Sequence, residues 1–222
     1  MPTPVTAMLT NFKFFALAYL NDWWQYDEQF FRGLHPQGRS RRENLVKAAT
    51  YYQVIRSFSK GGDASASRRL GNALKELDAA ISVANNAIRP ANVDGVVVDL
   101  ATRLGSVYKK KGAAQELVSA ASKFLWIRRR SPVVIYDRRA HKCLTRMNAT
   151  PGTSYASFRK VWQTEFPKYE IQIRSACRNL SQSNIKNFAP SGIAKRRFNS
   201  VLRARWFHER VFDKFLWWNG AG

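Results

Sequence analysis

Apolar and polar positions recur with the period of an α-helix along most of this chain. Apolar side chains spaced three to four residues apart predict helices over residues 11–32, 41–55, 68–88, 113–128 and 138–147. The apolar run Val96–Val98 has no partner run of similar quality, so we interpret it as the start of a further helix rather than as a strand. Less regular patterns predict helices that start at Ser154, at Glu170 and, running to the C-terminus, at Ser191. The chain is therefore predicted to be all-α.

Local signals mark where these helices begin and end. Residues 40–43, Ser-Arg-Arg-Glu, have the form of a capping box at a helix start. Residues 59–63 (Ser-Lys-Gly-Gly-Asp) and 109–112 (Lys-Lys-Lys-Gly) are expected to interrupt the helices around them, and Arg89-Pro90 to end one. Residues 131–136 are expected to be short and extended, with Asp137 as the N-cap of the helix that follows.

The composition is that of a folded chain. Apolar residues make up 45% of the 222 positions and aromatic residues 13%, which is enough to build a packed core. The length fits one domain, or two small lobes that share a cleft. We expect a helical N-terminal lobe over residues 1–92 and a strongly basic lobe over residues 93–222.

The sequence carries no signal for a membrane or for secretion. No apolar run reaches the roughly 18–20 residues that span a bilayer. The apolar stretch 12–20 contains Lys13 and lacks both a basic leader and a cleavage site, so a signal peptide is not expected. The two cysteines, Cys143 and Cys177, provide no disulfide framework and are interpreted as buried small side chains. These features favour a cytoplasmic protein.

The positive charge is large and unevenly distributed. The net charge is +22, and residues 1–100 hold 12 basic and 9 acidic side chains whereas residues 101–222 hold 25 and 6. A folded chain tolerates such self-repulsion more easily when a polyanion neutralises it, so nucleic acid is the leading partner. A ribosomal protein or a protein that binds anionic membranes would carry the same charge, and composition alone does not choose among them.

Several chemistries lack the residues that they need. The three histidines and two cysteines show no zinc-site spacing, and an iron–sulfur cluster would need four cysteines. The sequence contains no glycine-rich phosphate loop and no G-x-S-x-G motif. We expect His141 and His208 on helix surfaces rather than in acid–base roles. Neither a metal nor a cofactor is expected.

Asp137 is the main candidate for catalysis. It is the only carboxylate between Leu117 and Thr164, a window that also contains ten Lys or Arg residues. Among so many cations it is expected to be ionised at neutral pH. A fixed carboxylate beside bound DNA can stabilise the positive charge that develops on a sugar and can position a water, and glycosidic cleavage needs both. The ordinary alternative is an N-cap that contributes about 1 kcal/mol to its helix.

The sequence around Asp137 resembles the helix-hairpin-helix DNA glycosylase superfamily. The resemblance is to its archaeal-type 8-oxoguanine branch, where an A-S-x-F-L stretch precedes I-x-D-R at the same distance. The matching residues here are Ala121, Ser122, Phe124, Leu125, Ile135, Asp137 and Arg138. The resemblance covers residues 95–150 and extends weakly to residues 206–218. It implies an all-α bundle of two sub-lobes around a DNA-binding cleft, with Asp137 as the catalytic carboxylate.

Two features depart from the family in this register. The family's Schiff-base Lys falls on Ser119, which cannot form an imine and so implies a monofunctional, water-using enzyme. Lys123, one turn further along the same helix face, is the alternative amine. The glycine-rich hairpin turn is replaced by Ala-Ala-Gln-Glu at residues 113–116. Lys109, Lys110 and Lys111 are the candidates for equivalent phosphate contacts, and a solvated turn is the equally weighted alternative for them.

Other residues are assigned to DNA contact and to base binding. Arginines on both sides of Asp137 are predicted to contact DNA, against the alternative of a solvated charged face: Arg128, Arg129, Arg130, Arg138 and Arg139. An excised base must leave the stack and is usually held against aromatic rings. The candidate rings are Trp23, Trp24, Trp126, Trp217 and Trp218. For any one Trp, core packing is the more common role.

The leading prediction is a monomeric DNA glycosylase that flips a modified base out of double-stranded DNA and leaves an abasic site. The resemblance implies that its substrate is an oxidised purine such as 8-oxoguanine, whereas the missing Schiff-base Lys and the altered hairpin favour a more specialised base. A hypermodified phage base such as glucosylated hydroxymethylcytosine is the other possibility, since similar small basic glycosylases of bacterial defence excise such bases. The alternative function is non-catalytic nucleic-acid binding. A toxin-like nuclease is disfavoured because the sequence indicates no paired carboxylates near the basic region.

Overall fold

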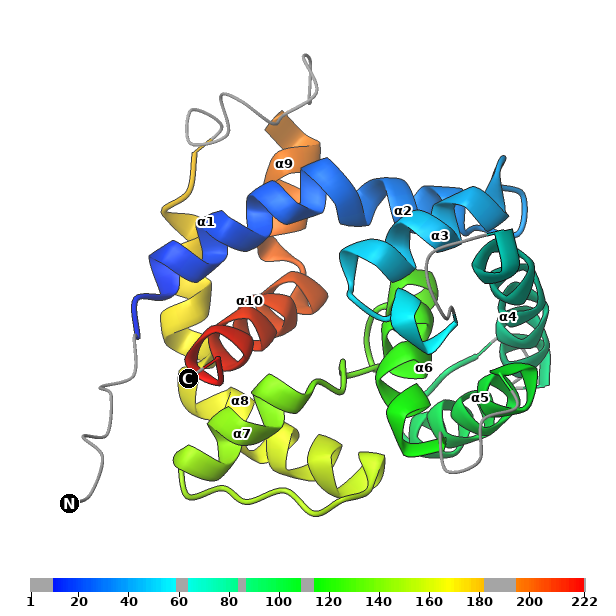
Figure 1. The fold of residues 1–222 in the computed structure, drawn as a ribbon. Helices are drawn as coiled ribbons and strands as arrows, with labels where there is room; N and C mark the ends of the chain where they lie inside the picture. Colours follow the sequence, from blue (N-terminus) through cyan, green and yellow to red (C-terminus); the bar gives the residue numbers. More distant parts are fainter. Residues whose placement is uncertain (1–9, 59–63, 84–86, 109–113, 182–194, 222) are drawn as a thin grey trace. The chain divides into compact units, whose positions relative to one another are not determined.

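The computed structural model is helical over most of the residues that it describes, which are 10–58, 64–83, 87–108, 114–181 and 195–221 (Figure 1). No strand occurs within these ranges, so the all-α prediction is confirmed. The α-helices are α1 (Phe12–Asp22), α2 (Glu28–Gly33), α3 (Arg41–Tyr51), α4 (Ala64–Val83), α5 (Val93–Tyr108), α6 (Ala114–Arg129), α7 (Arg138–Arg146), α8 (Tyr155–Arg178), α9 (Lys195–Arg203) and α10 (Arg205–Asn219). A π-helical turn, Trp23–Asp27, joins α1 to α2, and Ile55–Ser57 form a 3-10 turn.

The chain forms two compact units, each built from separate stretches of sequence. Unit 1 consists of residues 1–21, 137–152 and 160–222, and unit 2 of residues 22–136 and 153–159. Residues from the expected N-terminal lobe, 1–92, therefore occur in both units. Asp137, the main candidate from the sequence, is the residue at which the chain passes from unit 2 into unit 1.

Unit 1 is packed through aromatic side chains of α1, α8 and α10. Phe15 of α1 meets Phe215 of α10 edge to face at 5.7 Å between ring centroids. Trp162 of α8 stacks on Phe166 at 5.1 Å and contacts Phe212 of α10 at 5.4 Å. Burying one such ring stabilises the fold by about 1.5–3 kcal/mol, so these rings are a main source of stability for unit 1.

Unit 2 is organised around the pairing of α5 with α6 and of α4 with α5. The buried positions of α5 recur at helical spacing, and they are Val93, Val97, Leu100, Ala101 and Leu104. In α6, every residue from Ala120 to Arg128 is buried, polar side chains included. A helix buried on all sides is a central element of its unit.

The predicted capping box at Ser40 is wrong in its geometry, although the helix does begin at Arg41 as expected. Ser40 has φ 54° and ψ 37°, and its side chain makes no capping hydrogen bond. A side-chain cap needs an extended backbone at the N-cap, and the left-handed conformation turns the hydroxyl away from the helix. Asn44 Nδ2 instead donates to the carbonyl oxygens of Ser40, at 3.1 Å, and of Arg39, at 3.3 Å.

Two predictions for the C-terminal half are also wrong. No helix starts at Glu170, because α8 runs unbroken from Tyr155 to Arg178 with Pro167 inside it. Its buried side chains continue on both sides of the proline, and this burial outweighs the roughly 3 kcal/mol that an interior proline costs. The helix expected from Ser191 to the C-terminus is interrupted at Ala204, whose extended backbone (φ −71°, ψ 133°) separates α9 from α10. Residues 191–194 lie outside the described residues.

Candidate active site

Asp137 is the N-cap of α7, as the sequence predicts. Its backbone is extended (φ −139°, ψ 138°), and its Oδ1 accepts a hydrogen bond of 2.9 Å from the backbone N–H of Arg139. This bond satisfies one of the N–H groups that every helix leaves open at its start, and it fixes the orientation of the carboxylate. Asp137 is therefore a held carboxylate at the positive end of a helix.

The segment that leads to Asp137 is anchored within unit 2 by two side chains. The hydroxyl of Tyr155 accepts from the backbone N–H of Val134 at 3.1 Å and donates to the carbonyl oxygen of the same residue at 2.9 Å. Ser122 Oγ accepts from the backbone N–H of Tyr136 at 3.0 Å. Because this segment has no strand partner in the described part of the chain, Tyr155 satisfies the backbone of Val134 and Ser122 the backbone N–H of Tyr136, as a neighbouring strand would. The residues just before Asp137 are thus fixed by α6 and by the start of α8.

Within unit 1, the start of α7 packs tightly against the end of α10. Gly220 lies against the backbone of Arg139 so closely that a Cβ at residue 220 would overlap the Arg139 carbonyl oxygen. The Arg139 guanidinium lies 4.3 Å from the centroid of the Trp217 ring, a cation–π contact. Arg146, at the other end of α7, donates to the carbonyl oxygen of Asn219 at 2.8 Å. The C-terminal turn of α10 is therefore part of the surroundings of Asp137.

Asp213 is a second carboxylate near Asp137, and it is not among the candidates predicted from the sequence. It lies on α10, where its Oδ1 accepts from Trp162 Nε1 at 2.8 Å and its Oδ2 from Arg210 Nη1 at 3.0 Å. Burial raises the pKa of Asp213 to about 6; the two donors oppose this rise, and the negative charge of Asp137 adds to it. The sequence signal was available, since Asp213 stands among apolar neighbours one turn after Arg210. Asp213 is buried and Asp137 half-buried, and the two are close enough for the charge of Asp137 to contribute to the raised pKa of Asp213.

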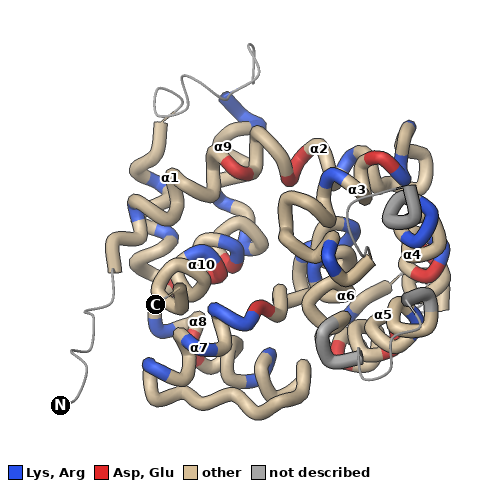
Figure 2. Tube along the Cα trace, viewed as in Figure 1, with Lys and Arg blue, Asp and Glu red and all other residues tan. Residues whose placement is uncertain are grey.

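The predicted DNA-contacting arginines lie in different environments. Arg138 is exposed at the start of α7, a helix with Lys or Arg at several positions and no acidic residue (Figure 2). Arg128 is buried in unit 2, and its guanidinium lies 3.9 Å from Asp78. Burial lowers the pKa of Arg128, and Asp78 partly compensates. Arg130 places its guanidinium 3.8 Å from the ring centroid of Phe31. Arg129 is half-buried, and Lys109, Lys110 and Lys111 lie outside the described residues.

Neither candidate for the amine position is an exposed amine. Ser119 of α6 is half-buried, and its carbonyl oxygen accepts from the hydroxyl of Ser122 at 3.2 Å. Lys123 is buried, with 6% of its surface exposed, and its Nζ donates to the carbonyl oxygen of Tyr52 at 3.3 Å. Tyr52 is the C-cap of α3, where a cation is favourable against the helix dipole. This hydrogen bond at the C-terminus of α3 is therefore a structural reason for the burial of Lys123.

The five candidate tryptophans divide into two sets. Trp23, Trp24 and Trp126 are buried in unit 2. Trp217 is half-buried beside Arg139, and Trp218 is 50% exposed. Trp217, in the second set, contacts Arg139 of the basic helix α7.

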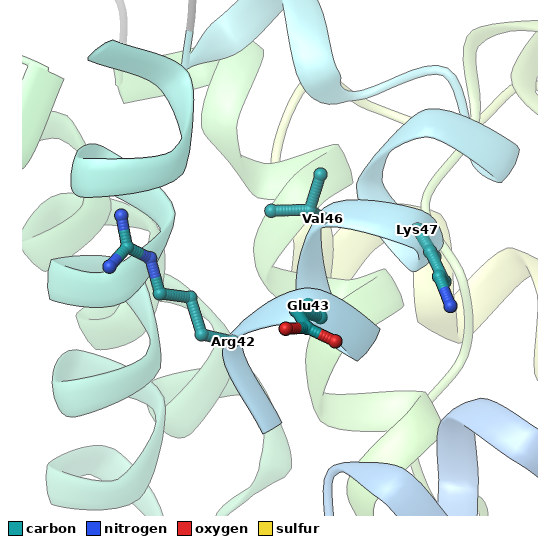
Figure 3. Close-up of a pocket in the computed structure, with 4 residues that line it drawn as sticks. All are labelled: Arg42, Glu43, Val46 and Lys47. Atoms are coloured by element: carbon teal, nitrogen blue, oxygen red, sulfur yellow. The ribbon is translucent and has the colours of Figure 1, made fainter. Parts of the chain in front are cut away.

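A pocket in unit 2 does not involve the predicted site residues. Arg42, Glu43, Val46 and Lys47 line it, all from α3, with Arg42 extending toward α4 (Figure 3). The Cδ of Arg42 lies 3.6 Å from the position that a Cβ on Gly71 of α4 would take. The pocket has a mixed, charged lining and holds none of the residues around Asp137.

The remaining chemistry-bearing residues give no second site. Among the described residues, no group of three or more His, Cys, Asp or Glu side chains is placed to hold a metal ion. Cys143 and Cys177 are buried as expected, and burial raises their pKa values to about 11 and about 12. The expectation that His208 lies on a helix surface is wrong, because His208 is buried. A hydrogen bond of 2.8 Å between its Nε2 and the carbonyl oxygen of Leu202 satisfies the ring, and burial lowers its pKa. His141 is half-buried.

Comparison of the chain with models of protein families, with curated proteins and with solved structures gives no match. In the described part of the chain, every helix falls short of the length and apolar character needed to cross a bilayer.

Proposed function

We propose that this protein is a monofunctional DNA glycosylase with Asp137 as its catalytic carboxylate. The observation that carries the proposal is the placement of Asp137, a carboxylate fixed by the backbone at the start of a helix that otherwise bears only basic charges. Such a group is suited to stabilise a cationic sugar next to a phosphate backbone. The basic charge of residues 101–222 supports a DNA partner.

In the proposed reaction, a flipped nucleotide places its C1′ next to Asp137. The C1′–N bond breaks, the base leaves with the bonding electron pair and takes up a proton from solvent, and positive charge develops on the sugar. The Asp137 carboxylate stabilises this charge and accepts a proton from the water that adds to C1′. The products are the free base and an abasic site.

The absence of an amine at position 119 supports the monofunctional form of the reaction. Ser119 has no nitrogen to form a Schiff base, and the amine of Lys123 is engaged at the end of α3. We therefore expect no covalent adduct when the protein is treated with borohydride in the presence of modified DNA. An adduct that disappears on Lys123→Ala would assign lyase chemistry to Lys123 instead.

The substrate class proposed is a modified base in double-stranded DNA, acted on by a monomer. The candidates are an oxidised purine, such as 8-oxoguanine, and a glucosylated hydroxymethylcytosine of phage DNA. Incubation of the protein with DNAs of both kinds, followed by mass spectrometry of the released bases, distinguishes them.

The decisive variant is Asp137→Asn, because asparagine is as good an N-cap as aspartate and only the negative charge is lost. We expect base release to fall by a factor of about 100 or more, with salt-dependent DNA binding retained. Asp99→Asn is the matched control, since Asp99 pairs with Arg103 on α5 in unit 2. The excision proposal fails if the wild type releases no base from any of these DNAs.

The second candidate function is non-catalytic nucleic-acid binding. The observation that favours it is the net charge of +22, which by itself requires no chemistry at Asp137. In that case the wild type and Asp137→Asn bind DNA with the same salt dependence and neither releases a base.

A further inference from the structure

Unit 1 exposes two adjacent aromatic rings, Phe14 at the start of α1 and Trp218 at the end of α10. Trp218 is 50% exposed although it belongs to the last turn of a well-packed helix. It contacts Phe14 of α1, itself 38% exposed, edge to face at 5.2 Å. The core beneath is already filled by Phe215 and Leu216, both fully buried. Trp218 is thus not needed to close the core. Adjacent exposed apolar rings of this kind are typical of binding surfaces.

Cations border this aromatic surface. Arg139 lies against the Trp217 ring, and Lys214 Nζ lies 5.8 Å from the centroid of the same ring. We name the set Phe14, Arg139, Lys214, Trp217 and Trp218 the C-terminal surface. The adjoining helix α7 adds exposed basic side chains and no acidic one, and these are Arg138, Lys142 and Arg146. The surface therefore combines an exposed indole with a positive surround.

We propose that the C-terminal surface binds unpaired bases of a DNA strand, with Trp218 as the ring on which a base stacks. Every base has a π-face, so an exposed indole binds bases with little sequence preference, while neighbouring cations bind the phosphates. Trp218 is assigned the stacking role because Trp217 is half-buried and already carries Arg139 on its ring. The occupant is a polyanion rather than an apolar partner because Arg139 and Lys214 lie against the neighbouring Trp217 ring, and α7 carries basic side chains and no acidic one.

This proposal stands apart from catalysis by Asp137. Excision requires an unpaired base, so a surface of this kind also suits a glycosylase. It is tested on unmodified DNA, from which no base is released. Failure of the binding test and failure of the excision test are therefore separate results.

The experiment compares two oligonucleotides with the same number of phosphates, each about 12 nucleotides long so that they cover one site. One is oligothymidine, and the other carries abasic residues at every position. Affinities are measured by fluorescence anisotropy at a fixed salt concentration. We expect the wild type to bind oligothymidine about tenfold more tightly than the abasic strand, a difference within the range of stacking by one base.

The variants separate stacking from charge and from apolar area. Trp218→Leu keeps an apolar side chain but removes the π-face, so the preference for oligothymidine should fall to near unity while affinity for the abasic strand is unchanged. Trp218→Phe should retain part of the preference. Ile171→Ala is the control, because Ile171 is 81% exposed on α8 of the same unit and carries no aromatic ring. It should leave both affinities unchanged.

Three outcomes would overturn the proposal. The first is equal affinity of the wild type for the two strands, which would reduce the surface to a phosphate-binding patch. The second is a preference for oligothymidine that survives Trp218→Leu. The third is displacement of oligothymidine by polyglutamate of equal charge in the wild type but not in Trp218→Leu, which would assign Trp218 to an acidic protein partner.

Discussion

Trp162 of α8 donates its indole N–H to Oδ1 of Asp213 on α10 at 2.8 Å, and this bond holds a carboxylate inside an aromatic core. Arg210 supplies the second donor, to Oδ2, at 3.0 Å. Burial nevertheless disfavours the charged form of Asp213, so that its pKa lies at about 6 instead of the ordinary 3.8. Asp213 is therefore the buried carboxylate of unit 1 whose pKa is raised toward neutral pH.

We predict that Asp213 makes the stability of the protein depend on pH between about 4 and 7. Its pKa is raised in the folded state, so the folded state favours the protonated form. This contribution is fully present below about pH 4 and is lost as the pH rises through about 6. The wild type should thus lose on the order of 2 kcal/mol relative to Asp213→Asn across this range.

Urea denaturation at a series of pH values measures this effect. Asparagine at position 213 can still accept the hydrogen bond from Trp162. Loss of the ion pair with Arg210 changes the free energy of unfolding by a constant amount and does not change its slope with pH. Asp99→Asn, on half-exposed α5, is the control and should follow the wild type. Parallel curves for the wild type and Asp213→Asn would show that the buried carboxylate does not titrate in this range.

The capping role of Asp137 can be separated from its charge by two substitutions. Asp137→Asn should leave stability almost unchanged because the amide oxygen can accept the bond from Arg139. Asp137→Ala removes the cap and should cost about 1 kcal/mol. Both should abolish base release to a similar degree. If Asp137→Asn keeps wild-type activity while Asp137→Ala loses it, the residue acts through the helix and not through its charge.

The hydroxyl of Tyr155 is expected to contribute strongly to stability. Tyr155→Phe leaves the buried N–H and C=O of Val134 without their partner, and unsatisfied buried groups cost about 1–3 kcal/mol. Chemical denaturation should show a loss of that size. Tyr26→Phe provides the comparison, since its ring remains stacked on Tyr51 and only a hydroxyl is lost. Equal stabilities of the two variants would mean that water replaces the Tyr155 hydroxyl without cost.

Two glycine substitutions should act in opposite directions. A Cβ at Gly220 would overlap the backbone of Arg139, so Gly220→Ala should cost about 1–3 kcal/mol and disturb the start of α7. A Cβ at Gly95, on α5, meets nothing within 4 Å, and Gly95→Ala should stabilise by about 0.5–1 kcal/mol through its helix propensity. Thermal denaturation reports both. A neutral Gly220→Ala would indicate that the last turn of α10 moves aside freely.

The features that could be predicted from the sequence are those that depend on near neighbours. The helices α5, α6 and α7 follow from the apolar period, and the Asp137 cap from a short polar side chain placed before that period begins. The cap at Ser40 failed because its side chain needs a particular backbone conformation, which the residue type alone does not specify.

Other features depend on which helix faces meet, and the sequence does not contain that information in readable form. Lys123 and Arg128 carry charges that favour the surface, yet both are buried within unit 2 because α6 is enclosed on all sides. Asp213 finds its donor in Trp162, 51 residues earlier in the chain. A side chain's period along a helix is local, whereas its solvation is decided by contacts with distant segments.

The sequence by itself determined an all-α chain, a strong positive charge and a carboxylate at the start of a helix, because each follows from composition or from interactions over a few residues. The tertiary structure decided which charges are buried, that Asp213 accompanies Asp137, and that Trp218 remains exposed beside cations. These depend on packing between α1, α7, α8 and α10, which brings together residues far apart in sequence, and only such packing sets the burial and the electric field at each group.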